Sequence, residues 1–363
     1  MMIKKYYRIL NKKVIGMKKK YYNNLSNKLH VNGEISEVTV IKGNHNGKNL
    51  LGEKLFKSKD YIFIEDENNE SFWNSVLEKI DFNKGTHILY LENGVELFIE
   101  YITRKPHLVI CGGGHIALPL CKIGKMLDFS VTIIDDRPEF ANCERFPITD
   151  NILCKDFNEA FKEIQFNKNT YFVIITRGHK DDRKCLEIIL KSDFFYVGMI
   201  GSKSKVAFVT NNMLENGYTK EEINKVHTPI GLSIGGQTPA EIAVSIAAEI
   251  ILVKNEKESS NIDDNILDEI CKEKNVMMLT TIIEKHGSCP RGVGTKMLIY
   301  ENKEFIGTVG GGSIENAVYK KALELIESKE CMVEKYDLSN SDASKLGMAC
   351  GGTVKVLFEF IDV

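Results

Sequence analysis

Short apolar runs alternate with amphipathic stretches through the middle of the chain. Four runs rich in β-branched and aromatic residues occupy positions 107–111, 130–134, 171–176 and 195–200, and a helical pattern follows each run. Strands that alternate with helices along a chain form a parallel sheet with helices on both faces. The pattern therefore predicts a doubly wound, Rossmann-like α/β domain over residues 106–255.

The last helix of this domain has clear start signals. Thr238 is expected as its N-cap, Pro239 stands at the first helical position, and Glu241 completes a capping box. The apolar run that follows, residues 242–253, is too short to span a bilayer. We therefore predict a helix buried in the domain rather than a membrane segment.

The segments on either side of this domain share one order of elements. After a polar linker, the end of the chain predicts a strand, an amphipathic helix and a closing strand, and the beginning predicts the same series. The matching segments are 38–43 with 279–287, 70–80 with 313–326, and 94–102 with 352–361. The sequence therefore predicts an internal repeat of a smaller α+β domain.

The two predicted copies differ in their loops. The first copy lacks counterparts of the segments GSCPRGVG, GTVGGG and MACGG that the second copy carries. We expect a degenerate copy over residues 1–105, the Rossmann-like domain over 106–255, a linker and leading helix over 256–275, and an intact copy over 276–363. Because only the intact copy has the three loops, we expect it to carry the chemistry.

Composition and charge restrict the class of protein. Of the 363 residues, 43% are hydrophobic and 27% are charged, which is typical of soluble globular chains. The formal net charge of -2 argues against nucleic acid as a partner, because proteins that bind nucleic acid carry a basic excess. The lysine-rich N-terminus lacks the apolar run of a signal peptide, so we expect a cytoplasmic protein that binds no membrane.

The nine cysteines are spread along the chain, and no two of them form a C-x-x-C pair. This spacing argues against the usual zinc sites and against a disulfide framework. We expect the thiols to be reduced, as they are in the cytoplasm.

The segment VICGGGHIA, at positions 109–117, fits the pattern G-x-G-x-x-A between a strand and a helix. Gly112 is expected to allow the tight turn, Gly114 to let a pyrophosphate approach the backbone, and Ala117 to allow close helix packing. The pattern predicts a site for NAD(P) or another nucleotide. A Rossmann-like domain that no longer holds a cofactor would need the same glycines, and this interpretation stays open.

Polar residues after the strands add to this predicted crevice. Asp135 and Asp136 end the second strand, where an acidic side chain would meet a ribose hydroxyl. Ser202 and Lys203 follow the fourth strand and could bind an anion, although a solvated turn explains them equally well. His115 belongs to the glycine loop and could lie over the crevice or only satisfy a hydrogen bond.

The intact copy concentrates glycines in three loops. Ser288, Cys289 and Arg291 stand in the first of them, among glycines, and therefore on irregular backbone. In the second, Gly310, Gly311 and Gly312 lead into a helix whose N-cap we expect to be Ser313, which makes a candidate anion site. Tight hairpin turns are the alternative explanation for so many glycines.

The third loop, LGMACGG, places Cys350 directly before Gly351 and Gly352. As a thiolate, Cys350 could act as a nucleophile, a soft metal ligand or a sulfur carrier. On its own such a cysteine is more often a small turn residue. The absence of this loop from the first copy favours a ligand instead, because the fold can form without it.

The segments of the middle domain resemble the Rossmann-like domain of the XdhC/CoxI family, the xanthine dehydrogenase accessory proteins. The carrying segments are HLVICGGGHIALPLCKIGKMLDFSVTIIDDRPEFA, YFVIITRGHKDD, YVGMIGSKSK and PIGLSIGGQTPAEIAVSIAAEI, and in the last domain TTIIEKHGSCPRGVGTKMLI, GTVGGGSIENAV and LGMACGG. Members of this family usually carry the cysteine-loop domain before the Rossmann-like domain. Here the intact copy follows it, which a duplication with loss of the first site explains.

The resemblance implies a maturation factor, more a chaperone than an enzyme, for molybdenum hydroxylases of the xanthine dehydrogenase type. Such a protein binds molybdenum cofactor (molybdopterin), supports its sulfuration by a cysteine desulfurase, and delivers it to the apoenzyme. Cys350 would lie near the molybdenum or the transferred sulfur, and the other two glycine loops would hold the pterin phosphate. We also expect a homodimer, as for many soluble proteins of this kind.

Two other functions remain as alternatives. An NAD(P)-dependent oxidoreductase would use the glycine loop and Asp135, but the sequence offers no convincing acid or base for hydride transfer. A structural adaptor would bridge the dehydrogenase and a sulfur donor without binding a cofactor.

Overall fold

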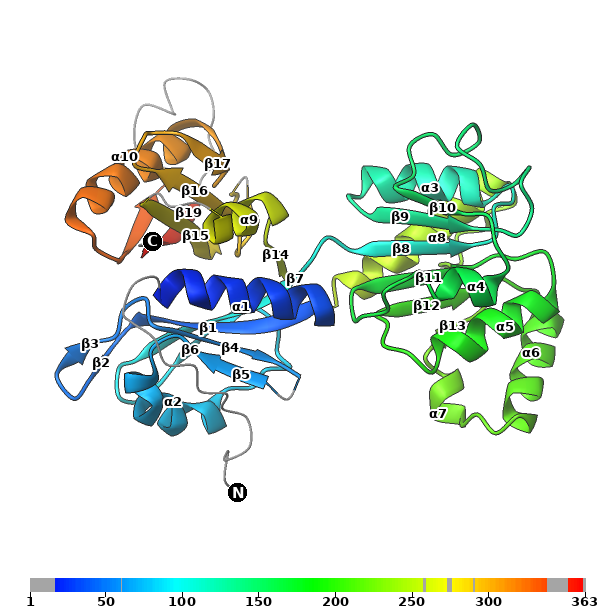
Figure 1. The fold of residues 1–363 in the computed structure, drawn as a ribbon, viewed down its shortest axis with the longest axis horizontal. Coiled ribbons are helices and arrows are strands. Elements are labelled where there is room, and N and C mark those ends of the chain that lie inside the picture. Colours follow the sequence, from blue (N-terminus) through cyan, green and yellow to red (C-terminus); the bar gives the residue numbers. More distant parts are fainter. Residues whose placement is uncertain are drawn as a thin grey trace. The chain divides into compact units, whose positions relative to one another are not determined.

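The structure is a computed structural model that describes residues 17–59, 61–256, 259–272, 276–289, 291–337 and 352–361. The chain divides into two compact units. One unit combines Met1–Arg104 with Lys257–Val363, and the other is Lys105–Glu256. The two predicted α+β segments therefore share a unit, and the middle segment forms its own (Figure 1).

The middle unit is a doubly wound α/β domain, as predicted. Its six strands are parallel and lie in the order β10-β9-β8-β11-β12-β13. The strands are β8 (His107–Cys111), β9 (Ser130–Ile134), β10 (Asn151–Leu153), β11 (Thr170–Ile174), β12 (Tyr196–Met199) and β13 (Val226–His227). The helices are α3 (Ala117–Met126), α4 (Phe157–Phe161), α5 (His179–Ile189), α6 (Lys203–Glu215), α7 (Lys220–Ile223) and α8 (Pro239–Lys254).

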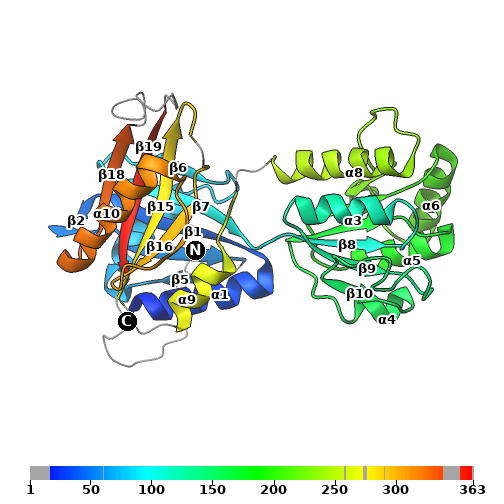
Figure 2. The same cartoon turned by 90° about the horizontal axis from the view of Figure 1, so that it is seen from above.

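Two apolar cores lie on opposite faces of this sheet. Helices α3 and α8 pack on one face, and α4, α5 and α6 pack on the other (Figure 2). Thr238 caps α8 through a capping box with Glu241, which confirms the predicted helix start. The capping box fixes where α8 begins, and the buried apolar residues of this helix belong to the first of the two cores.

The other unit contains two antiparallel sheets of the same topology. The first has the strand order β5-β4-β1-β7 with β6 beside β7, and the second has the order β17-β16-β15-β19-β18. The first copy comprises α1 (Met17–Asn32), β1 (Glu34–Lys42), the hairpin β2 (Asn44–His45) and β3 (Lys48–Asn49), β4 (Lys54–Ser58), β5 (Tyr61–Ile64), α2 (Glu70–Val76), β6 (His87–Tyr90) and β7 (Glu96–Thr103). The second comprises α9 (Asp264–Lys272), β15 (Met277–His286), β16 (Lys296–Tyr300), β17 (Phe305–Gly307), α10 (Gly312–Ser328), β18 (Met332–Asp337) and β19 (Thr353–Ile361). The predicted internal repeat is confirmed.

A detail of the strand pairing supports this equivalence. The ladder between β1 and β7 shifts register between Val40 and Lys42, and the ladder between β15 and β19 shifts between Ile282 and Glu284. Both copies therefore have an irregularity at one matching position, which is a feature that related sheets preserve.

The two copies pack with their sheets facing inward. Helix α2 packs on the outer face of the first sheet and α10 on the outer face of the second. Helices α1 and α9 contribute to a core that both sheets share (Figure 1). The short strand β14 (Ser260–Asn261), which follows the middle unit in the chain, pairs with β7 of the first copy.

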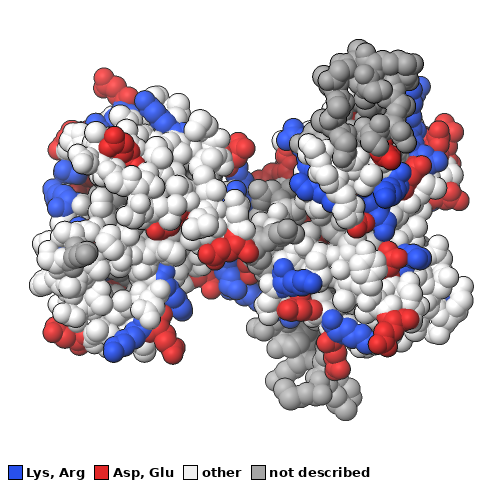
Figure 3. All heavy atoms as spheres, turned by 180° about the vertical axis from the view of Figure 1, so that it is seen from behind, with Lys and Arg blue, Asp and Glu red and all other residues white. Residues whose placement is uncertain are grey.

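The surface carries mixed charge. Figure 3 shows basic and acidic side chains interspersed over the face that it displays, in agreement with the formal net charge of -2. In the part of the chain that the structure describes, no helix combines the length and the apolar character that crossing a membrane requires.

Candidate functional site

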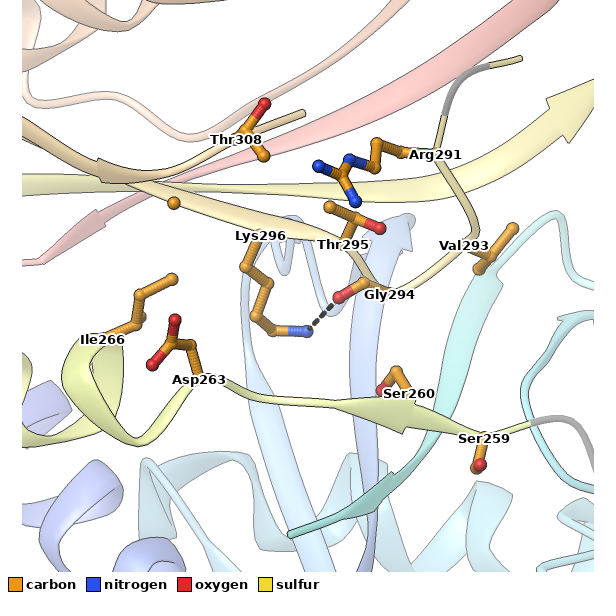
Figure 4. Close-up of a pocket in the computed structure, with 11 residues that line it drawn as sticks. Ser259, Ser260, Asp263, Ile266, Arg291, Val293, Gly294, Thr295, Lys296 and Thr308 are labelled. Carbon is orange, nitrogen blue, oxygen red and sulfur yellow. Dashed lines mark hydrogen bonds between the residues drawn. The ribbon is translucent and has the colours of Figure 1, made fainter. Parts of the chain in front are cut away.

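A cavity of about 390 Å³ opens in the second copy, beside the turn that precedes β16. Two of the predicted glycine loops meet there, because Arg291 and Gly294 come from the first loop and Thr308 from the second. The third side is formed by residues 259–266, which connect the end of the middle unit to α9. In Figure 4, Arg291 and Thr308 lie across the cavity from Asp263.

The glycines of the two loops bring their backbones close to other chain segments. A Cβ atom on Gly294 would lie 2.2 Å from Cβ of Ser260, and the residue has a positive φ of +85°. A Cβ atom on Gly307, at φ +83°, would lie 2.6 Å from the carbonyl oxygen of Lys296. Only glycine fits these two positions, and the close approach creates one wall of the cavity.

A buried ion pair lies at the base of the cavity. The ammonium group of Lys296 contacts the carboxylate of Glu100, and only 4% and 2% of these side chains are exposed. Lys296 also donates to the carbonyl oxygen of Gly294 at 3.3 Å, and Ser260 Oγ donates to Glu100 Oε1 at 2.5 Å. Glu100 therefore balances the charge of Lys296 and satisfies its hydrogen bonds, which a buried ion pair requires.

Arg291 is the cation of this cavity that remains available to a ligand. It is exposed and has no hydrogen bond or ion pair to any other described residue. Thr295 and Ser259 add hydroxyl groups to the lining, and Asp263 accepts a hydrogen bond from the N–H of Asn265 at 2.9 Å. A guanidinium group among hydroxyls and glycine backbone suits a phosphate or another anionic oxygen group.

Cys289 and Gly352 bring the first loop against the end of the third. The thiol of Cys289 is half-buried and donates to the carbonyl oxygens of His286 and Thr353 at 3.4 and 3.6 Å. A Cβ atom on Gly352 would lie 2.6 Å from the carbonyl oxygen of Ser288 and 2.8 Å from Sγ of Cys289. The predicted residues Ser288, Cys289 and Gly352 therefore lie together, whereas Cys350 and Gly351 lie outside the described residues.

The start of α10 differs from the prediction. Gly311 is the N-cap, and Ser313 lies inside the first turn, so the expectation that Ser313 caps this helix is wrong. The carboxylate of Glu315 caps the helix instead, accepting hydrogen bonds from the N–H of Gly311 at 3.2 Å and from Thr308 Oγ1. The backbone breaks earlier than expected because Gly310, Gly311 and Gly312 all adopt positive φ. Glu315 thus brings a carboxylate to this helix start, and the expected anion site there stays a prediction.

The glycine loop of the middle unit has the predicted backbone. Gly112 has φ +114°, and a Cβ atom there would lie 2.5 Å from the carbonyl oxygen of Ile175. Gly114 has open space around its Cβ position, and Ala117 is fully buried at the start of α3. The predicted turn and the predicted close packing are confirmed, and binding of a nucleotide there stays a prediction.

The side chain of Asp135 binds the glycine loop and the neighbouring Arg137. Its buried carboxylate accepts hydrogen bonds from the N–H of Gly113 at 2.8 Å and from Nε of Arg137 at 2.8 Å. Burial alone would raise the pKa of Asp135, but these hydrogen bonds outweigh it and hold the pKa below its usual value. Asp136 is exposed and pairs with Arg177 at 3.2 Å, so it is the more accessible of the two acids.

Three other residues were predicted to line this crevice, and the structure gives a structural role to one of them. Ser202 is the N-cap of α6, and its Oγ accepts from the N–H of Lys205 at 3.3 Å. Lys203 is the first residue of α6, and His115 is exposed in the glycine loop. An anion site at Ser202 and Lys203 stays a prediction.

Sequence reasoning missed several residues that the structure brings together. Ser260, Lys296 and Thr308 line the cavity, and Glu100 of the first copy contacts Ser260 and Lys296. In the middle unit, the buried Asp182 binds Thr176 at 2.7 Å and Lys205, and burial raises its pKa. Among the described residues, no group of three or more His, Cys, Asp or Glu side chains could hold a metal ion.

The fold and the cavity together define a protein with a Rossmann-like domain and a duplicated α+β domain in which the second copy carries the open site. The family profile described as the XdhC Rossmann domain matches residues 108–250, and the profile described as the XdhC and CoxI family matches residues 271–337. The chain belongs to the XdhC and CoxI family.

Two similar proteins illustrate the extent of the likeness. A protein of Bacillus subtilis named as a probable xanthine dehydrogenase subunit is 28% identical over 209 residues, which are 57% of this chain and 61% of that protein. The "Uncharacterized protein YqeB" of Escherichia coli is 30% identical over 162 residues, 44% of this chain and 30% of that protein. The chain thus spans less than two thirds of the length of either relative.

A crystal structure described as a xanthine dehydrogenase from Bacillus halodurans has a TM-score of 0.47 and 24% identity to this chain. The likeness covers 64% of this chain and 65% of that one.

Proposed function

We propose that this protein is an accessory factor of a molybdenum hydroxylase of the xanthine dehydrogenase type. In this role it acts more as a chaperone than as an enzyme: it binds molybdenum cofactor as cargo, supports its sulfuration by a cysteine desulfurase, and delivers it to the apoenzyme. Membership of the XdhC and CoxI family supports the accessory role, as does the likeness to a protein named as a probable xanthine dehydrogenase subunit.

The cavity at the two glycine loops is the observation that carries this proposal. Its volume of about 390 Å³ lies within the range of small-molecule sites, roughly 300–1,000 Å³. Molybdopterin carries a phosphate group, and Arg291 with the hydroxyls of Thr295 and Ser259 offers donors that suit phosphate. The residues present therefore fit the anionic part of this cargo.

Cys350 is the residue that we assign to the metal end of the cargo. A thiolate is a soft ligand that suits molybdenum. Gly352, which follows Cys350 by two positions, lies against Ser288 and Cys289 of the first glycine loop. We propose that the Rossmann-like crevice takes the nucleotide portion of a dinucleotide cofactor or a separate nucleotide.

The test is to isolate the protein from cells that make molybdenum cofactor and to measure molybdopterin bound per chain. Arg291→Ala should lower the affinity about 10- to 100-fold, because a charged hydrogen bond to phosphate contributes roughly 1.5–3 kcal/mol. Lys320→Ala, which removes an exposed charge on α10, is the control and should retain the wild-type amount. Equal molybdopterin in wild type and Arg291→Ala would contradict the cavity as the phosphate site.

Cys350→Ala separates the role of the thiol from that of the cavity. The variant should keep molybdopterin in the cavity but should lose molybdenum or activation of the partner hydroxylase. Equal metal content and equal activation in the variant would remove Cys350 from the mechanism.

Titration with NAD separates this proposal from the alternative of an NAD(P)-dependent oxidoreductase. Tight NAD binding with substrate-dependent turnover would favour the oxidoreductase. Retained molybdopterin without turnover would favour the accessory factor. An adaptor that binds no cofactor would keep partner binding in every glycine-loop variant.

A further inference from the structure

The inner faces of the two sheets carry matching residues at matching positions. Thr39 of β1 pairs with Lys54 of β4, and Thr281 of β15 pairs with Lys296 of β16. By the same registers, Glu100 of β7 occupies the position that Glu359 occupies in β19, two residues before the isoleucine that faces the start of β1 or β15. Each copy therefore contributes one lysine and one glutamate to the inner face at equivalent positions.

The two copies exchange these charges. Lys54 of the first copy contacts Glu359 of the second at 2.9 Å, and Lys296 of the second contacts Glu100 of the first. A small apolar cluster between the sheets has the same symmetry, because Ile41 and Phe98 meet their equivalents Ile283 and Leu357. Such a reciprocal exchange is what an isologous two-fold interface makes between two identical subunits.

The symmetry breaks at the cavity. In the first copy, the equivalent turn is the one that precedes β4 and contains Gly52. There Lys18 from α1 donates to the carbonyl oxygen of Gly52 at 3.3 Å and pairs with Glu65 at 3.6 Å. Burial alone would lower the pKa of Lys18, but Glu65 and Glu359 outweigh it and raise the pKa. A charged lysine therefore contacts the backbone at Gly52 in the first copy, whereas Gly294, which is equivalent to Gly52, borders the cavity.

We infer that the first copy is the built-in partner subunit of the second and that it contributes Glu100 to the cavity as a positioning residue. Glu100 reaches the cavity base from the first copy, where it holds Ser260 and Lys296, both of which line the cavity. Its carboxylate also cancels one of the two positive charges there, so that Arg291 alone meets an anionic ligand. The identity of the ligand rests on the proposed function, whereas the placement of Glu100 does not.

The matched variants Glu100→Gln and Glu359→Gln test this inference. Both remove one carboxylate from an exchanged ion pair, but only Glu100 contacts residues of the cavity. The first measurement is binding of inorganic pyrophosphate to the full chain by calorimetry. Glu100→Gln should bind pyrophosphate several-fold more tightly than wild type, because it keeps the shape of the side chain and leaves Lys296 free to attract the anion. Glu359→Gln should bind as wild type does.

The second measurement needs no ligand. Acylation of Lys296 by acetic anhydride, which releases acetate as the amide forms, should be faster in Glu100→Gln than in wild type when followed by mass spectrometry. It should stay unchanged in Glu359→Gln. Thermal unfolding of both variants shows whether they keep the fold.

The outcomes distinguish the inference from the proposed function. If wild type does not bind pyrophosphate, the phosphate site of the proposed function fails, and the acylation rate of Lys296 still decides the role of Glu100. The inference is overturned if neither variant changes the pyrophosphate affinity or the acylation rate of Lys296, or if the two variants change them to the same extent. It is also overturned if Glu100→Gln weakens pyrophosphate binding.

Discussion

Two aspartates and two glycines show how single residues hold the glycine loop of the middle unit. Asp135 and Asp136 are neighbours in the sequence, but only Asp135 is buried and bound to the loop backbone. Gly112 and Gly114 belong to one motif, but only the Cβ position of Gly112 has another segment of the chain against it. Gly114 is therefore the control for Gly112.

Asp135→Asn should lower the free energy of unfolding by about 1–3 kcal/mol at pH 7, because the hydrogen bonds from Arg137 and Gly113 favour the carboxylate. The pKa of Asp135 is lower in the folded chain than in the unfolded chain. The stability that it contributes is therefore complete above the unfolded value of about 3.9 and is lost as the pH falls through the folded value. Denaturant titrations at several pH values should show the difference between wild type and variant narrowing below pH ~4.

The control for this prediction is Glu144→Gln, an exposed acid of the same unit. It should leave the free energy of unfolding unchanged at every pH value of the titration. A loss as large as that of Asp135→Asn would mean that net charge, and not the hydrogen bonds of Asp135, sets the effect.

Gly112→Ala should destabilise the middle unit by about 1–3 kcal/mol, because it strains a positive φ and places a methyl group against Ile175. Gly114→Ala meets no neighbour and should cost less than about 1 kcal/mol. Unfolding followed by circular dichroism compares the two. Equal losses would show that the turn can relax and that Gly112 is not needed for its conformation.

At the scale of elements, the turn between β15 and β16 decides whether the cavity exists. Gly294→Ala places a methyl group within 2.2 Å of Ser260 and should therefore displace β14 or close the cavity. Gly292→Ala in the same turn meets nothing within 4 Å. The first variant should lose pyrophosphate binding and the second should retain it, as calorimetry can measure. Retained binding in Gly294→Ala would place the ligand elsewhere.

The helix starts show what local sequence can and cannot predict. Thr238 and Glu241 form the predicted capping box of α8, because all of its parts lie within four consecutive residues. The start of α10 was predicted wrongly at Ser313, since Glu315 reaches back to cap the helix and three glycines shift its first turn. Backbone geometry decides which of the two side chains, Ser313 or Glu315, binds at the helix start, and the amino-acid sequence does not specify that geometry directly.

At the scale of the whole molecule, the order of elements was predictable and the cavity was not. Periodic apolar runs predicted the parallel sheet and the repeat, because each element must bury one face. The contact between Glu100 and Lys296 joins residues that are 196 positions apart in two different copies. Neither residue stands out in its own strand, so only the packing of the two sheets reveals their pairing.

The packing of the two copies leads to a further prediction. Ile41 and Ile283 lie in the shared apolar cluster, so Ile41→Asp and Ile283→Asp should each destabilise the same unit. Each change buries an unpaired charge, which is among the most destabilising single substitutions. Scanning calorimetry should show a lower transition for this unit and an unchanged transition for the middle unit. A shift of both transitions by either variant would mean that the units unfold together.

The different surroundings of Gly52 and Gly294 have a consequence for the number of ligands bound per chain and for the evolution of the two copies. In a dimer of identical subunits every substitution appears twice, so a change that blocks one site blocks both. Joining the two halves in one gene removes that constraint, and the surroundings of Gly52, which Lys18 contacts, can then differ from those of Gly294 at the cavity. We expect the cavity of the second copy to bind one equivalent of ligand per chain, and the first copy is free to change wherever it does not support its neighbour.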